Sequence, residues 1–231
     1  ENEDESEDGT AGFESLLDVC LSLGLVRKRL KWHYRSRREG LIAFSNQYFY
    51  DHSLITFPSV DDGAERAVKF ERVVDGRFTD RVNIVEARHT ATKVIEHFRS
   101  SPKRSLGVIA FSQSQQNRIL DEIESLRGQN PDLEEFFNED RHERFFVKNL
   151  ENVQGDERDV IMLSVGYGPD AAGKIAMRFG PLNRQGGERR LNVAVTRARY
   201  GMVVIASMTA TDIDLSRTSA DGPRLLRAFL D

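Results

Sequence analysis

Residues 191–199 read LNVAVTRAR and place two arginines, Arg197 and Arg199, behind a run of small and apolar residues. As a helix, this stretch has apolar residues at positions i, i+3, i+4 and i+7, which form one stripe that must dock on the core. The stripe consists of Leu191, Ala194, Val195 and Ala198. Two residues of helix rotate by about 200°, so at most one arginine faces a given cleft. A guanidinium in a fixed position suits a transferring phosphate, although a core helix with solvated arginines explains the same pattern.

Two further segments carry residue types that suit a nucleotide. In residues 30–36, Tyr34 beside Arg35 combines a flat ring for a base with a planar cation for a phosphate. In a second segment, Gly155 permits a tight turn before an apolar strand, and Glu157 could accept a hydrogen bond from a ribose hydroxyl. Loops at strand ends are where α/β proteins place ligand groups. Taken alone, the first segment also fits a basic strand edge and the second an ordinary polar turn.

Residues 168–175 read GPDAAGKI and match the phosphate-loop pattern G-x-x-x-x-G-K-[ST] at every position but the last. That last position offers a hydroxyl to Mg²⁺, and Ile175 cannot coordinate a metal. Gly180-Pro181 also stands where a long helix should direct its N-terminus at the phosphate. We therefore reject a phosphate loop here. No apolar strand ends in paired acids either, so the chain lacks the groups that hold the β-phosphate and Mg²⁺, and no metal site is expected.

The composition is that of an ordinary globular protein with a sizeable core, since 39% of the 231 residues are apolar and 9% are aromatic. Residues 1–8 hold six acids and no base, and removing these charges turns the net charge of −4 into +2. Residues 27–38 carry seven bases and no acid. This local positive field suits a polyanion such as nucleic acid, or simply an exposed solvated segment.

The single cysteine, Cys20, excludes an internal disulfide and fits a reducing compartment. No apolar run approaches the roughly 20 residues of a membrane span, and the N-terminus is acidic where a signal peptide would be basic and then apolar. The chain is therefore expected to be soluble and cytoplasmic, with no membrane partner.

The apolar pattern predicts alternating helices and strands after an acidic, flexible linker at residues 1–12. Helices are expected at 13–23, 41–50, 84–99, 113–126 and 223–230, and Gly24 is expected to end the first of them. Strands are expected at 68–74, 106–111, 145–147, 160–165 and 202–206. The segment 166–187 is rich in glycine and proline and is expected to be a long loop. Strands separated by helices imply a parallel sheet with crossovers and hence an α/β fold.

Together and in this order, the three segments resemble motifs of the second RecA-like domain of superfamily 1 nucleic-acid helicases. HYRS at 33–36 is similar to motif IV, VQGDERD at 153–159 to motif V and LNVAVTRAR to motif VI. The amino-acid sequences of the last two motifs resemble the Upf-type branch of this superfamily. The run FFVKNLENVQGDERDVI at 145–161 is similar to large bacterial members of that branch. LIAFSNQYFY at 41–50 and GVIAFSQSQQ at 107–116 also fit. The resemblance runs from about residue 25 to residue 206.

The resemblance implies a RecA-like fold of the P-loop NTPase class over residues 13–231, with 166–187 as a branch-specific insert. In that family, ATP lies between two RecA-like domains, and the first domain holds the phosphate loop and Mg²⁺. This chain would then be the second, C-terminal motor domain, without a phosphate loop of its own. The cofactor implied is ATP, with its Mg²⁺ held by the absent first domain.

Mapped by motif, Tyr34 would lie against the adenine and Arg35 would contact the γ-phosphate. Glu157 would hold the ribose, and Gly155 would let the backbone approach the nucleotide. Arg197 would be the arginine finger, which contributes on the order of a thousandfold or more to phosphoryl transfer. These implied roles make Arg197 and Arg35 the catalytic candidates and leave Arg199 as a structural or interdomain residue.

The partners implied are a single strand of DNA or RNA and the N-terminal RecA-like domain of the same parent protein. The candidate nucleic-acid contacts are Ser112, Asn152 and Gln115, which falls where the family keeps a glutamine. The chain departs from the family pattern at Trp32, before motif IV, and at Val153, where relatives often carry an aromatic residue. These departures leave the adenine pocket and the strand path open.

Three hypotheses follow. The leading one is the C-terminal motor domain of an ATP-dependent helicase, catalytically incomplete as an isolated fragment. The alternative is a non-catalytic nucleic-acid- or protein-binding module on a helicase-like fold, and a weaker third is a self-contained enzyme that uses residues 168–175 as a phosphate loop. If Arg35, Glu157 and Arg197 lay more than about two side-chain lengths apart, the binding module would be favoured.

Overall fold

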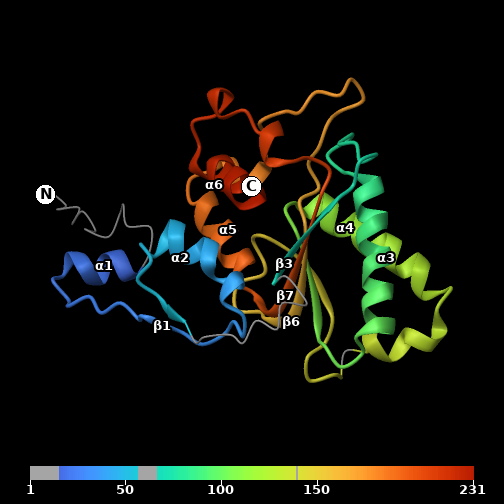
Figure 1. Ribbon diagram of the computed structural model, residues 1–231, viewed down its shortest axis with the longest axis horizontal. Helices are drawn as coiled ribbons and strands as arrows, with labels where there is room; N and C mark the ends of the chain where they lie inside the picture. The colour runs from blue at the N-terminus through green and yellow to red at the C-terminus, as the bar shows by residue number, and fades with distance from the viewer. Residues whose placement is uncertain (1–15, 57–66, 139) are drawn as a thin grey trace, which may run out of the picture. The chain divides into compact units, whose positions relative to one another are not determined.

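The computed structural model describes residues 16–56, 67–138 and 140–231 (Figure 1). The chain divides into two compact units, residues 1–32 and residues 33–231. The acidic segment 1–12, expected to be a linker, lies outside the described residues. In the first unit, α1 (Leu16–Ser22) is followed by Gly24, whose φ of +77° ends the helix as predicted.

The second unit is built on a five-stranded sheet in which every strand pair is parallel. Its strands are β3 (Val68–Arg72), β4 (Leu106–Ala110), β5 (Phe146–Asn149), β6 (Arg158–Ser164) and β7 (Ala198–Ala206). Their order across the sheet is β3-β7-β6-β4-β5. The predicted α/β fold with a parallel sheet is therefore confirmed. A separate two-stranded sheet, formed by β1 (Trp32–His33) and β2 (Ile55–Thr56), was not predicted.

Helices cover both faces of the large sheet (Figure 1). One face is covered by α3 (Ile84–Ser100) and α4 (Gln113–Arg127), and the other by α2 (Ala43–Phe49), α5 (Gly187–Val195) and α6 (Asp221–Leu230). Short 3₁₀ helices connect them: η1 (Glu39–Leu41), η2 (Pro131–Phe137), η3 (Gly180–Asn183), η4 (Ala210–Asp212) and η5 (Leu215–Arg217). Within the described residues, none of the helices combines the length and apolar character needed to cross a membrane.

Successive residues of the strands point alternately into two apolar cores. On β4, Ile109 packs in the core with α5 and α6, whereas Val108 and Ala110 pack in the core with α3 and α4. On β7, Val204 and Ile205 divide in the same way. Both faces of the sheet are thus buried, as parallel sheets require.

The segment 166–187 is irregular as expected, apart from η3 and the first residue of α5, but its second half is part of the core. Met177, Phe179 and Leu182 are buried and pack with α5 and α6. A Cβ added to Gly222, at the start of α6, would lie 2.1 Å from the carbonyl oxygen of Leu182. Glycine at this position therefore lets α6 approach the backbone of the segment.

The expected helix over residues 191–199 is wrong in its second half. The helix α5 ends at Val195, Thr196 is its C-cap, and Ala198 already belongs to β7. Ala198 is buried as a strand residue and not as the fourth member of a helical stripe. The two arginines are therefore separated by a change of secondary structure and not by a helical rotation of 200°.

Candidate functional site

Arg197 lies in the turn between α5 and β7, and three oxygens hold its guanidinium. Nε donates to the carbonyl of Val193 at 2.7 Å, Nη1 to the carbonyl of Asp156 at 3.4 Å and Nη2 to Oγ1 of Thr196 at 3.0 Å. Carbonyls at a helix C-terminus carry partial negative charge, which orients a cation there. All three acceptors are neutral, and Arg197 forms no ion pair within the described part of the chain. The site thus contains a buried, oriented cation that an anion can neutralise.

Arg35 and Glu157 lie beside Arg197 although they come from distant segments of the chain. Nε of Arg35 donates to Oε2 of Glu157 at 2.7 Å, and its Nη1 donates to the carbonyl of Thr196 at 3.4 Å. Arg197 in turn contacts the backbone of Asp156, the neighbour of Glu157. The structure therefore brings the three predicted residues together on one site.

The electrostatics of this site are those of two neighbouring cations, of which only Arg35 is paired with the carboxylate of Glu157. Burial lowers the pKa of Arg197 first, and the nearby Arg35 lowers it further, while Glu157 and Asp156 act in the opposite direction. A second anion beside Arg35 and Arg197 would relieve this crowding of positive charge. A phosphate group suits the site because each guanidinium offers several donors to its oxygens.

The site lies at the amino ends of β6 and β7, because Glu157 directly precedes β6 and Arg197 directly precedes β7. The general rule for open α/β sheets places ligands at the carboxyl ends of the strands, whereas this site lies at the opposite edge, in loops that lead into two strands. Gly155 has a φ of +90°, and a Cβ added there would meet nothing within 4 Å. Its backbone conformation therefore favours glycine and leaves the main chain open to approach.

Tyr34 is 75% exposed, so its ring is accessible to a planar ligand. Its neighbours fix its backbone. Nε2 of His33 accepts from the backbone N–H of Ser36 at 3.1 Å, and Oγ of Ser36 donates to the carbonyl of Ala198 at 3.4 Å. Burial, then the charges of Arg35 and Arg197, lower the pKa of His33, which favours the neutral, accepting imidazole. The positioning role of His33 and Ser36 was not predicted.

Arg199 is turned into an ion network with Glu143 and Asp159 that reaches the candidate site only through Glu157. Its Nη2 lies 2.6 Å from Oε2 of Glu143 and 2.8 Å from Oδ1 of Asp159, and its Nη1 lies 3.7 Å from Oε1 of Glu157. Hydrogen bonding to Arg199 lowers the pKa of Glu143 to about 2. This arrangement agrees with the structural role expected of Arg199. Glu143 and Asp159 carry no signal in the sequence that marks them as its partners.

The three candidate nucleic-acid contacts differ in accessibility. Ser112 is the partly buried N-cap of α4, and Asn152 is exposed in the loop between β5 and β6. Gln115 is only 1% exposed: its Oε1 accepts from the N–H of Asn83 at 2.9 Å, and its Nε2 donates to the carbonyl of Asn83 at 3.2 Å. The buried side chain of Gln115 therefore cannot contact a nucleic-acid strand directly in this structure. It instead links the start of α3 to α4 through the backbone of Asn83.

A buried carboxyl group at the carboxyl ends of β6 and β7 was not predicted. Oε1 of Glu86 accepts from Oγ of Ser164 at 2.8 Å and from the N–H of Gly166 at 2.6 Å, and Oε2 accepts from Oγ of Ser207 at 2.7 Å. Burial raises the pKa of Glu86 to about 7, despite the hydrogen bonds that act to lower it. Glu86 thus ties α3 to two strands through a group whose ionisation depends on pH near neutrality.

In the segment that resembles a phosphate loop, residues 168–175, the backbone N–H groups bind a side chain of the same segment. Oδ1 of Asp170 accepts from the N–H groups of Ala172 at 2.8 Å and Lys174 at 2.9 Å, where a phosphate loop directs such groups at a phosphate. No α-helix begins directly after Ile175, because the next helical turn is the short 3₁₀ helix η3. Both observations agree with the rejection of a phosphate loop here.

We expect that replacing Lys174 by alanine leaves ATP affinity unchanged in a nucleotide-binding protein that contains this chain. The reason is that Lys174 lies in a loop whose amides are already occupied by Asp170. Calorimetric titration of ATP into the wild type and the variant checks this, with an Asp170→Ala variant to test whether the loop binds phosphate once it is vacated. A loss of affinity of about tenfold or more on replacing Lys174 would revive the self-contained enzyme.

Comparison with known proteins places the chain among helicases. A family model described as an AAA domain matches residues 13–209. An uncharacterized ATP-dependent helicase of Mycoplasma genitalium is 35% identical over 235 residues, which cover 100% of this chain and 20% of that protein. The ATP-dependent helicase NAM7 of Saccharomyces cerevisiae is 26% identical over 211 residues, which cover 84% of this chain and 20% of that protein.

A solved C-terminal domain of a possible DNA helicase from a Lactobacillus species is 13% identical, with a TM-score of 0.42, over 75% of this chain and 86% of that one. This likeness is too low to add to the fold assignment, which rests on the sheet order. The chain spans about one fifth of the length of the curated relatives that it matches. Because the AAA domain model covers most of the sequence, the chain belongs to this family and is a RecA-like domain of a superfamily 1 helicase.

Proposed function

We propose that this chain is the second motor domain of an ATP-dependent nucleic-acid helicase and supplies one side of an interdomain ATP site. The observation that carries the proposal is the convergence of Arg35, Glu157 and Arg197, which the sequence places up to 162 positions apart. If the three residues were unrelated, Arg35 and Glu157 would have no reason to meet at Arg197, a buried cation that forms no ion pair within the described residues. The same convergence counts against the non-catalytic binding module, which would not require it.

Each residue contributes a distinct interaction to this function. Arg197 is pre-oriented by three hydrogen bonds, so its positive charge can stabilise negative charge that develops on a phosphate without a reorganisation cost. Arg35 has donors left on Nη2 for a phosphate oxygen while Nε stays on Glu157. Glu157 can accept a ribose hydroxyl, and the exposed ring of Tyr34 can stack on adenine.

The groups that hold Mg²⁺ and the β-phosphate would come from the first motor domain of the parent protein. Among the described residues, no group of three or more histidine, cysteine or acidic side chains could hold a metal ion. ATP, when bound, supplies the phosphoryl group that is transferred to water. The residues of this chain bind and orient that group, and the other domain completes the site.

A single strand of DNA or RNA is the proposed second partner. Ser112 and Asn152 follow the carboxyl ends of β4 and β5, so they lie at the sheet edge opposite the nucleotide site. Binding at one edge and hydrolysis at the other would let the domain transmit nucleotide state across the sheet. Gln115 would take part by holding α3 and α4 together.

We expect the isolated chain to show no nucleic-acid-stimulated ATP hydrolysis, and activity to appear when the chain is joined to a phosphate-loop motor domain. The physical reason is that Arg35 and Arg197 stabilise transferring phosphate but do not hold Mg²⁺ or position water. Steady-state phosphate release, with and without single-stranded oligonucleotide, measures both. Magnesium-dependent turnover by the pure chain, lost on Arg197→Ala, would contradict the proposal.

A further inference from the structure

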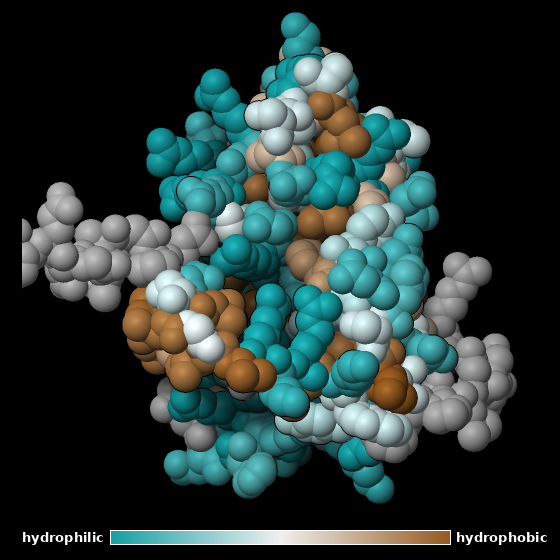
Figure 2. All heavy atoms as spheres, turned by 90° about the vertical axis from the view of Figure 1, so that its left-hand side faces the viewer, coloured by the Kyte–Doolittle hydropathy of each residue, from teal (hydrophilic) through white to brown (hydrophobic). Residues whose placement is uncertain are grey.

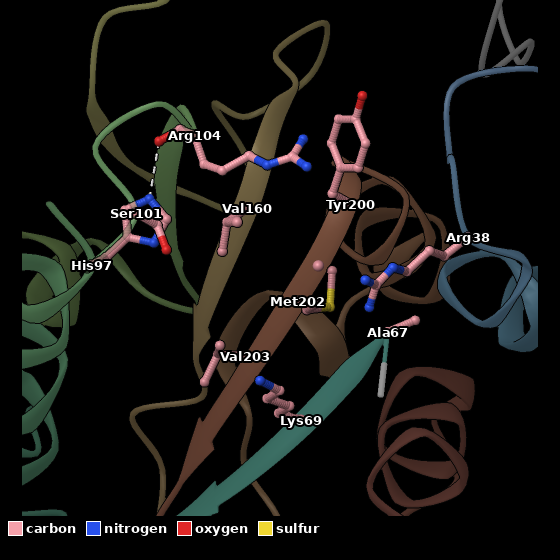
Figure 3. Close-up of a pocket in the computed structure, with 11 residues that line it drawn as sticks. Arg38, Ala67, Lys69, His97, Ser101, Arg104, Val160, Tyr200, Met202 and Val203 are labelled. Atoms are coloured by element: carbon pink, nitrogen blue, oxygen red, sulfur yellow. Dashed lines mark hydrogen bonds between the residues drawn. The ribbon is translucent and has the colours of Figure 1, made fainter. Parts of the chain in front are cut away.

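Arg197 stays unpaired although it is buried, which sets it apart from the cations around it. Hydrophilic side chains cover much of the face seen in Figure 2, where water screens their charges. The cations of the pocket in Figure 3 are engaged, because Arg104 lies over the ring of Tyr200, and Arg38 and Lys69 have interaction partners. Arg197 is only 9% exposed and forms no ion pair among the residues that the structure describes. Its unpaired charge therefore needs a structural cause.

Two acids border Arg197, and a different cation holds each of them. Glu157 is bound by Arg35, whose Nε lies 2.7 Å from Oε2. Asp156 is bound by Lys148, whose Nζ donates to Oδ2 at 2.6 Å. The carboxylate of Asp156 is thereby held by β5, while its carbonyl accepts from Nη1 of Arg197 at 3.4 Å. Arg197 thus contacts the backbone of Asp156 and not its negative charge.

Lys148 is held in place by the sheet and by an aromatic ring. It lies on β5, the edge strand of the sheet, where it pairs with Ile109 of β4. Its Nζ lies 5.5 Å from the centroid of the Phe146 ring. The ring of Phe146 packs so closely on Gly107 that a Cβ added to this glycine would collide with it. The ammonium of Lys148 is therefore presented to Asp156 from a rigid part of the fold.

Without Lys148, the carboxylate of Asp156 would have two cations nearby. Arg158 is the more exposed of the two, and its guanidinium lies 4.8 Å from the Phe146 ring and donates to backbone carbonyls. Arg197 is buried and already contacts the backbone of Asp156. Opposite charges attract more strongly where burial reduces the screening by water. The released carboxylate would therefore pair with Arg197 and neutralise the charge that a phosphate needs.

We propose that Lys148 is a positioning residue for ATP hydrolysis, which holds the carboxylate of Asp156 away from Arg197 and so keeps Arg197 available to a phosphate. This role rests on the proposed function of Arg197 in the nucleotide site. Lys148 acts through Asp156 and needs no contact with the nucleotide. It precedes residues 153–159, which resemble motif V, and was not among the predicted site residues.

The test uses a helicase that contains this chain and a phosphate-loop domain, with steady-state ATP hydrolysis at saturating oligonucleotide. Lys148→Met removes the ammonium and keeps the length of the side chain. Asp156→Asn, added to Lys148→Met, removes the negative charge and leaves the backbone carbonyl in place. Lys93→Met is the matched control, because the side chain of Lys93 is 29% exposed and pairs with Glu71 and Glu96 away from the site. Thermal unfolding checks that each variant is folded.

Lys148→Met is expected to lower kcat about tenfold with little change in KM, which is the change expected when Arg197 is lost as a ligand of the transition state. Adding Asp156→Asn is expected to restore about fivefold or more of this loss, because no carboxylate is then left to pair with Arg197. A pair that serves only as a scaffold would give the opposite result, since the second substitution would restore nothing. A crystal structure of the Lys148→Met protein is expected to show a carboxylate oxygen of Asp156 within about 4 Å of the Arg197 guanidinium.

The variant Arg197→Ala separates failure of this inference from failure of the proposed function. If it leaves kcat intact, the proposed function fails, and the role of Lys148 fails with it. If Arg197→Ala lowers kcat and Lys148→Met does not, only the role of Lys148 is overturned. That role is also overturned if the double variant is no more active than Lys148→Met, if Lys93→Met lowers kcat as much, or if the released carboxylate pairs with Arg158 instead.

Discussion

Replacing Arg197 by alanine is expected to lower kcat for ATP hydrolysis by about a thousandfold or more in a helicase that contains this chain and a phosphate-loop domain. The guanidinium is held by the carbonyls of Val193 and Asp156 and by Thr196, so its charge is already in position before the reaction begins. Such an interaction stabilises the transition state more than bound ATP, and its loss lowers kcat with little change in KM. Steady-state kinetics at saturating oligonucleotide measures both constants.

The variant Arg197→Lys is expected to stay close to Arg197→Ala although it keeps the charge. A lysine has one nitrogen and cannot bond to three oxygens in the fixed directions that Nε, Nη1 and Nη2 use. Arg189→Ala, on the preceding helix α5, is the control, because its side chain is 70% exposed. Thermal unfolding must show that the Arg197 variants remain folded. If Arg197→Ala kept more than about a tenth of kcat, the arginine-finger assignment would fail.

Most of the sheet and its helices could be predicted because burial on two faces leaves a simple pattern. The run at 106–111 is continuously apolar, as a central parallel strand must be, and β4 occupies residues 106–110. The periodicity of residues 84–99 likewise matches α3 to within one residue. Such patterns fail for elements of two or three residues, and β1, β2 and the 3₁₀ helices were missed or given different bounds for this reason.

The error at residues 191–199 arose because small apolar residues satisfy two periods at once. Ala198 fits the helical stripe with Leu191, yet it also begins the run ARYGMVVIA, whose valines and isoleucine favour a strand. Thr196 was the available signal, since a β-branched residue with a hydroxyl is poorly suited to the interior of a helix and here caps it. Arg199 is thus separated from Arg197 by the start of β7, and not by the helical rotation from which its structural role was predicted.

The residues of the candidate site could be named from three short segments, but their support could not. Nothing in the sequence shows that His33 would accept from Ser36 or that Glu143 would pair with Arg199. These contacts depend on which loops the sheet order brings together. The sequence gives only a weak indication that Glu86 is buried. It lies one helical turn before Thr90, which is on the inner face of α3.

The substitution Glu86→Gln is expected to remove a pH-dependent loss of stability. The pKa of this carboxyl rises from 4.5 to about 7 in the folded protein, so between these values the folded state binds a proton that the unfolded chain has released. Stability contributed by Glu86 is therefore present below about pH 4.5 and is lost as the pH rises through 7. The loss amounts to about 3 kcal/mol once the pH exceeds both values. Glutamine retains a buried polar group at the same place but carries no proton to lose.

Urea unfolding of the wild type and of Glu86→Gln, from pH 5 to pH 8, measures this effect as a difference at each pH. The difference is needed because burial lowers the pKa of His97, whose contribution is lost as the pH falls below 6.5 and so runs the opposite way. Subtracting the free energy of unfolding of one protein from that of the other cancels the contribution of His97. Glu96→Gln, at a side chain 57% exposed on the same helix, is the matched control. A difference between wild type and Glu86→Gln that stays constant with pH would show that Glu86 remains ionised in the cluster, and the bond from the N–H of Gly166 would then be charge-assisted throughout this range.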